Sequence, residues 1–148
     1  MTTTDRVFKT HKVIKVPISI THSTDEMLTD AAGANKWDIS DVNWERIVVE
    51  GNITTITGST AKVNLKILTS NDSNAGATTD TAAVKGNGST AMASGDKTAT
   101  GRFMFATGKS AADGSAASNI GKYIELLADK TNAITSIVGD AWIYVEGK

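Results

Sequence analysis

Two aromatic side chains near the C-terminus, Trp142 and Tyr144, are the residues of this sequence best suited to hold a ligand. They stand two positions apart in the run 141–146, where Ala, Ile and Val take the alternate positions. In a β-strand this alternation places the two rings on one face and the aliphatic side chains on the other. Aromatic rings exposed on a sheet stack on sugar rings or anchor protein interfaces. The alternative is that both faces are buried, between two sheets or under a loop.

The motifs that resemble catalytic ones lack the context that their chemistry needs. The run 108–110 (GKS) ends like a phosphate-binding loop, but Phe103 occupies the position of its first glycine and the following residues are poor helix formers. Residues 59–62 have Ser-x-x-Lys spacing, which works on a helix, whereas here the segment reads as a turn entering a strand. His11 and His22 lack metal-ligand spacing. We therefore predict no enzyme activity, no catalytic residue, no cofactor and no metal ligand.

Oxygen-rich loops around Asp72, Asp80 and Asp96 leave a calcium site as an alternative, although their spacing does not match an EF-hand. Solvated carboxylates in turns explain these residues more simply.

Composition limits the possible partners. The chain has 148 residues, no cysteine and a net charge of −1, and its basic residues are dispersed rather than clustered. Nucleic-acid binding normally requires a basic patch, so we expect no nucleic-acid partner. No apolar run reaches the roughly 18 residues that a membrane span requires, and the N-terminus lacks the apolar core of a signal peptide. We expect a protein without a membrane partner, made in the cytoplasm.

The alternation of apolar and polar residues predicts an all-β fold. Strands are expected at 8–21, 44–53, 62–69, 83–85, 101–106, 123–128, 133–138 and 141–146. The segments 44–53 and 62–69 are expected to form a hairpin around Gly58, the last strands are expected to pair in the same way, and Gly139-Asp140 is expected to separate the final two. Capping-box spacing at 23–26 predicts a short helix before Gly33. Seven or eight strands with irregular loops favour one antiparallel β-sandwich of jelly-roll type, residues 1–148.

Three segments are candidates for contact with other subunits. Pro17 removes a ladder donor from the first strand, which predicts an edge strand or a bulge there. An edge strand can accept another chain. Residues 1–8 read as an N-terminal arm, and 70–100 as a long loop of small residues that lies against a neighbouring subunit or projects from the surface.

The order of these segments resembles that of tailed-phage virion proteins, the small β-sandwich components encoded among head genes. The resemblance is carried by 63–72, which ends in Ser-Asn-Asp, by 123–127 (YIELL) and by 142–148 (WIYVEGK). It covers about two thirds of the chain, and sugar-binding sandwich modules share much of it. The segment 70–100 departs from the pattern, because it lacks the aromatic residue often found soon after Ser-Asn-Asp.

This resemblance implies a non-enzymatic structural protein on the exterior of a capsid, which decorates or cements it as a homo-oligomer. Its partners would be the major capsid protein or other virion proteins. The alternative is a carbohydrate-binding module, on a phage tail or receptor-binding apparatus, that uses Trp142 and Tyr144. The expected partner-binding residues are Thr2, Thr3, Thr4, Asp5, Arg6, Val7, Phe8, Pro17, Asn71 and Asp72.

Overall fold

The computed structural model describes residues 9–70, 82–83, 93–108, 122–131 and 133–147. Within these ranges the chain forms ten β-strands and no helix. The strands are β1 (Lys9–Ile20), β2 (Glu26–Met27), β3 (Trp37–Asp38), β4 (Trp44–Thr57), β5 (Lys62–Ser70), β6 (Ala82–Ala83), β7 (Ala93–Lys97), β8 (Gly101–Gly108), β9 (Tyr123–Thr131) and β10 (Ser136–Gly147).

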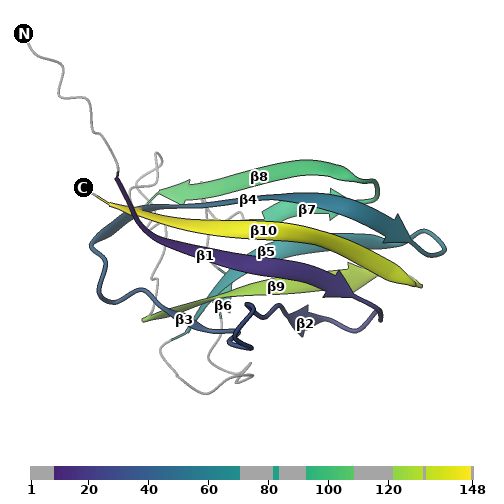
Figure 1. Cartoon of the computed structure of the whole chain (residues 1–148), viewed down its shortest axis with the longest axis horizontal. Helices are drawn as coiled ribbons and strands as arrows, with labels where there is room; N and C mark the ends of the chain where they lie inside the picture. Colours follow the sequence, from purple (N-terminus) through teal and green to yellow (C-terminus); the bar gives the residue numbers. More distant parts are fainter. Residues whose placement is uncertain (1–8, 71–81, 84–92, 109–121, 132, 148) are drawn as a thin grey trace, which may run out of the picture.

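The strands form two antiparallel sheets packed face to face, as the two layers in Figure 1 show. Sheet A has the order β1-β10-β4-β8, and sheet B has the order β2-β9-β5-β6. In sheet B, β3 also pairs with β9, and β7 also pairs with β5. If β2 with β3 and β6 with β7 each count as one position, both sheets have four positions, in the order of a jelly roll. The predicted all-β, antiparallel sandwich is confirmed.

The core lies between the sheets and is filled by the alternate residues that the sequence pattern assigns to it. In sheet A, β10 lies between β1 and β4 along nearly its whole length, and its alternate residues are buried on the face that packs against sheet B. The largest fully buried apolar side chains in this core are Ile and Leu, among them Ile18, Ile20, Ile47, Ile53, Leu65, Ile67, Ile124, Leu126, Ile137 and Ile143.

The two expected hairpins are wrong, although their strands exist. β4 lies in sheet A and β5 in sheet B, so the turn after β4 crosses between the layers. The connection between β9 and β10 crosses in the same way, and the two crossings meet where the Thr135 amide donates to the Thr57 carbonyl at 2.9 Å. Alternation in a sequence determines which face of a strand is buried, but not which strand lies beside it.

Two further local predictions are wrong. Gly139-Asp140 does not separate two strands, because both residues pair with β1 and β4 inside the continuous β10. The capping-box residues form no helix: the Asp25 carboxylate instead accepts a hydrogen bond from the Lys130 amide at 2.8 Å, and Glu26 begins β2. Pairing with β9 therefore outweighs the local helix signal.

The loop between β2 and β3 is held by one carboxylate. Asp30 accepts hydrogen bonds from the Trp37 indole at 3.0 Å and from the amides of Ala32 and Ala34 at 2.9 Å each. The indole bond, followed by the amide bonds, lowers the pKa of Asp30 below its ordinary value of 3.8. This loop positions Trp37, which is buried in the core.

Replacing Asp30 by alanine is expected to destabilise the protein by about 1–2 kcal/mol at neutral pH, because three donors lose their acceptor. A carboxylate with a lowered folded-state pKa adds stability above its unfolded-state pKa, and that stability is lost as pH falls through the folded-state value. The difference between wild type and variant should therefore narrow below pH 3.8. Urea titrations at several pH values measure this difference in unfolding free energy. Asp96→Ala is the control, since Asp96 is exposed and lies 3.6 Å from the Lys62 ammonium. If wild type and Asp30→Ala differed in stability by the same amount at every pH, the ionised Asp30 carboxylate would not be the form that stabilises the loop.

Candidate functional site

Trp142 and Tyr144 project from the outer face of sheet A, away from the core. The residues that alternate with them on β10, Ala141, Ile143 and Val145, are completely buried on the inner face. Both rings are themselves half-buried among the side chains of neighbouring strands. The possibility that the two aromatic residues lie between the sheets is therefore excluded, and they are accessible from outside.

The strand register surrounds these rings with a defined set of neighbours. One row across sheet A is Lys15, Trp142, Glu50 and Met104, and the next is Val13, Tyr144, Val48 and Ala106. Met104 is 70% exposed and Val13 is 54% exposed, unusually open positions for large apolar residues. These two rows on the outer face of sheet A are therefore mainly apolar, with Lys15 and Glu50 as their charged residues.

A groove of about 580 Å³ runs over this surface between β10 and β8. Trp142 and Tyr144 line the β10 side, and Arg102 and Met104 line the β8 side. Residues of β4 lie between them, because β4 pairs with both strands. We name this the aromatic groove; its lining is Glu50, Gly51, Asn52, Arg102, Phe103, Met104, Trp142 and Tyr144.

Two contacts hold the aromatic residues in place. The Tyr144 hydroxyl donates a hydrogen bond to Glu50 Oε1 at 2.7 Å. This bond raises the pKa of Tyr144 above its ordinary value of 10.0, because the Glu50 carboxylate stabilises the protonated phenol as a donor. The Lys15 ammonium lies 5.8 Å from the centroid of the Trp142 ring, within the range of a cation–π contact. Both rings therefore have defined orientations before any ligand binds.

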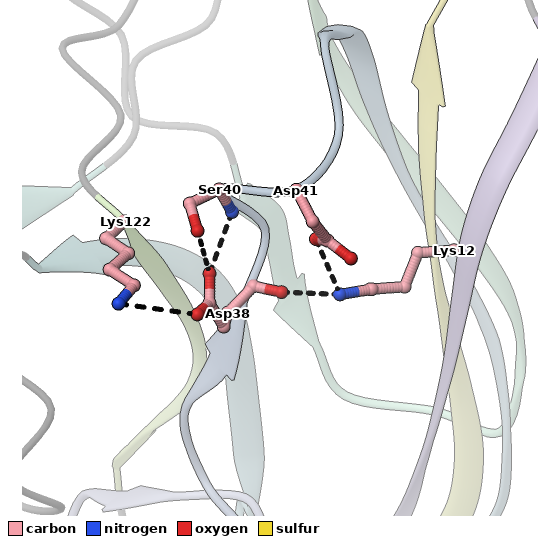
Figure 2. A network of polar contacts seen from close by, with 5 residues as sticks. All are labelled: Lys12, Asp38, Ser40, Asp41 and Lys122. Atoms are coloured by element: carbon pink, nitrogen blue, oxygen red, sulfur yellow. Dashed lines mark hydrogen bonds and ion pairs between the residues drawn. The ribbon is translucent and has the colours of Figure 1, made fainter.

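A second cluster of charges lies where β1, β3 and β9 approach one another, shown in Figure 2. Lys12 Nζ donates to the Asp38 carbonyl at 2.6 Å and to Asp41 Oδ1 at 3.0 Å. The Ser40 hydroxyl donates to Asp38 Oδ1 at 2.6 Å, and Lys122 Nζ lies 3.6 Å from Asp38 Oδ2.

The pKa shifts of this cluster agree with a structural role. Hydrogen bonds from Ser40, and then the charge of Lys122, hold the pKa of Asp38 below its ordinary value. Contact with Tyr123, and then the charge of Asp38, raises the pKa of Lys122. Each group is stabilised in its charged form by its neighbours, so the cluster links β1 of sheet A to β3 and β9 of sheet B rather than poising a group for proton transfer.

The other residues expected to bind partners are placed only in part. Pro17 lies on β1 and pairs with Asp140 of β10. β1 is an edge strand of sheet A, which is one of the two placements that a proline within a strand predicts. The expected contacts in the segments 2–8 and 71–72 lie outside the described residues.

Among the described residues, the weaker sequence candidates do not come together into a site, and Asp72 and Asp80 of the calcium alternative lie outside them. Lys62, of the Ser-x-x-Lys run, begins β5 and lies 3.6 Å from Asp96. His22 Nε2 lies 3.2 Å from Glu26. No group of three or more His, Cys, Asp or Glu side chains that could hold a metal ion occurs among the described residues. In the same part of the chain, no helix is long and apolar enough to cross a membrane.

Sequence reasoning identified Trp142 and Tyr144 but missed the other six residues that line the groove. The strand pattern contained part of the signal, since Arg102 and Met104 alternate with the buried Phe103 and Phe105. The same holds for Glu50 and Asn52, which flank the buried Gly51 on β4. Alternation in the sequence predicts that these side chains face outward. It does not predict that they lie beside Trp142, because that depends on pairing between strands far apart in the chain.

Comparison of the chain with models of known protein families, with curated proteins and with solved structures gives no match. Fold and site therefore define its class: a jelly-roll β-sandwich with an aromatic groove on the outer face of one sheet.

Proposed function

We propose that this protein is a non-enzymatic structural subunit of a virus particle, which decorates or cements the outside of a capsid. The observation that carries the proposal is β1, a twelve-residue strand that forms an edge of sheet A among the described residues. A free edge is a template for pairing with another chain, and jelly rolls are a frequent architecture of capsid domains. Fold alone does not determine function, so the proposal depends on the edge strand and on the sequence resemblance.

The composition of β1 favours selective rather than indiscriminate pairing. Lys9, Lys12 and Lys15 place charges along the edge, and Pro17 interrupts the row of backbone donors. Such an edge resists aggregation while leaving short stretches open to a matching partner. The exposed Val13 adds an apolar contact beside these charges.

Attachment would then depend on repetition. Each copy contributes a small contact of modest affinity, and copies linked as a homo-oligomer bind a regular lattice with much higher avidity. The major capsid protein or another virion protein is the proposed partner, reached through β1 and the residues that precede it.

Immunogold electron microscopy of virus particles from the source culture, with antibody against this chain, tests the proposal. Regular label over the heads is expected. Particles without label would overturn the virion assignment, and label confined to tail tips would overturn capsid decoration in favour of a receptor-binding role.

Removing residues 1–6, with a new initiating methionine, is expected to leave the β-sheet circular dichroism spectrum unchanged. It should lower the amount of protein on purified particles by about tenfold, because weakening each contact of a multivalent array multiplies the loss. Quantitative immunoblotting of particles against total protein measures the ratio. If this variant binds particles in the same amount as wild type, residues 1–6 do not belong to the contact surface.

A further inference from the structure

We propose that the aromatic groove binds a saccharide, with a pyranose ring stacked against Trp142 and its hydroxyl groups held by Glu50, Asn52 and Arg102. This inference goes beyond the proposed role in a virus particle, since it depends on the groove over β4 and not on the edge strand β1. The two can therefore be tested separately.

The apolar side of the groove suits a sugar ring. Pyranose rings carry a face of C–H groups that packs on an aromatic ring, and indole offers the largest such surface. Lys15 belongs to β1, on the opposite side of β10 from β4. The side of the indole that faces β4 and the groove is therefore the side left for a ligand. Met104, on the other wall, supplies an adaptable apolar surface.

The polar groups suit hydroxyl recognition. Glu50 and Asn52 stand two positions apart on β4, so both face the same side of the sheet. Carboxylate and amide oxygens accept from sugar hydroxyls, and amide and guanidinium nitrogens donate to them. Because Glu50 also accepts from Tyr144, its carboxylate is held in place, which lowers the entropy lost on binding.

Arg102 is the residue that most favours a ligand. It is exposed at the groove, and its guanidinium forms no ion pair with a carboxylate among the described residues. Its planar fork can donate two parallel hydrogen bonds to vicinal hydroxyls or to the carboxylate of an acidic sugar. The groove thus combines an aromatic wall, which can pack on the C–H face of a sugar ring, with donors and acceptors that can hold its hydroxyl groups.

The test is isothermal titration calorimetry, with saturation-transfer NMR, on the full chain. The probes are maltohexaose, cellohexaose, chitohexaose and an oligogalacturonate. Binding of at least one oligosaccharide is expected, with saturation transferred to the C–H protons of the sugar ring. An oligogalacturonate preference would assign Arg102 to a sugar carboxylate, and a neutral preference would assign it to hydroxyls. Absence of binding to all four would overturn the proposal.

Variants locate the site. Trp142→Ala is expected to weaken binding more than about tenfold, because a stacked ring contributes strongly to such sites. Val138→Ala, on the same strand and the same outer face but outside the groove, should bind like wild type. If Trp142→Ala does not fold, Met104→Asp provides the second variant, since Met104 is exposed and its replacement leaves the core intact. Wild-type affinity in the folded groove variant would overturn the site.

The competing occupant of this face is a second copy of the chain. Sedimentation equilibrium of wild type and Met104→Asp tests it: a dimer that the substitution converts to monomer would overturn the saccharide proposal. Label on particles, combined with no saccharide binding by the wild-type chain, would leave the proposed function intact and overturn the saccharide proposal. Saccharide binding without label on particles would do the reverse, so the failure of each proposal can be recognised separately.

Discussion

Replacing Glu26 by alanine is expected to destabilise the protein by about 3 kcal/mol, whereas replacing Lys130 by methionine should change its stability by less than about 1 kcal/mol. The two residues form one ion pair, in which Lys130 Nζ lies 3.0 Å from Glu26 Oε1. The side chain of Lys130 is completely buried and that of Glu26 is 30% exposed. Removing the carboxylate leaves an ammonium inside the protein without its counterion, whereas removing the lysine leaves a carboxylate that water reaches.

The surroundings of the pair add to this asymmetry. His22 Nδ1 lies 3.4 Å from Lys130 Nζ, and His22 Nε2 lies 3.2 Å from Glu26 Oε2. Without Lys130, Glu26 keeps its contact with His22 and its access to solvent. Without Glu26, an imidazole nitrogen 3.4 Å away is a weak substitute for a carboxylate oxygen at 3.0 Å. Methionine also fits the volume that the buried lysine stem leaves.

Urea denaturation of Glu26→Ala, Lys130→Met and the double variant measures the pair as a thermodynamic cycle. The double variant should recover most of the loss seen in Glu26→Ala, because no charge is then left buried. Asp96→Ala, which removes the exposed partner of Lys62, is the control and should cost less than about 0.5 kcal/mol. Equal losses in Glu26→Ala and Lys130→Met would show that burial of the ammonium is not what makes the carboxylate necessary.

The sequence predicted the faces of the strands better than their neighbours. Alternation in 62–69 identified Val63, Leu65 and Ile67 as buried, and all three lie in the core. It could not show that β4 and β5 belong to different sheets, because a strand of either layer needs the same one-sided pattern. A glycine-containing turn is equally compatible with a hairpin and with a crossing between layers.

The candidate site shows the same division. The alternation of 141–146 gave the common face of Trp142 and Tyr144. Their polar partners are far away in the chain, since Glu50 and Tyr144 are separated by 94 residues and meet only through the β10–β4 register. Physical chemistry of the segments predicts which side chains face outward, but pairing across the sheet decides which of them share a groove.

The wrong prediction that Gly139-Asp140 separates two strands has a structural explanation at Gly139. A glycine followed by an aspartate favours a turn in an isolated sequence. In the fold, Gly139 lies inside β10, where the ladder to β4 shifts register between Val138 and Gly139. A Cβ atom there would lie 2.1 Å from the Asn52 carbonyl oxygen and 3.0 Å from the Ile53 Cα. The glycine is needed because two backbones approach closely, not because the chain turns.

Replacing Gly139 by alanine is therefore expected to destabilise the protein by about 3 kcal/mol, at the upper end of overpacking effects, since backbone atoms of a central strand cannot move aside as a flexible side chain can. Urea denaturation followed by circular dichroism measures the change. Val138→Ala is the matched control, because its side chain is 39% exposed on the same strand and its loss should cost less than about 1 kcal/mol. A Gly139→Ala variant as stable as wild type would mean that β10 and β4 can separate locally without loss. The shifted register would then not be a rigid support for Glu50 and Asn52 in the aromatic groove.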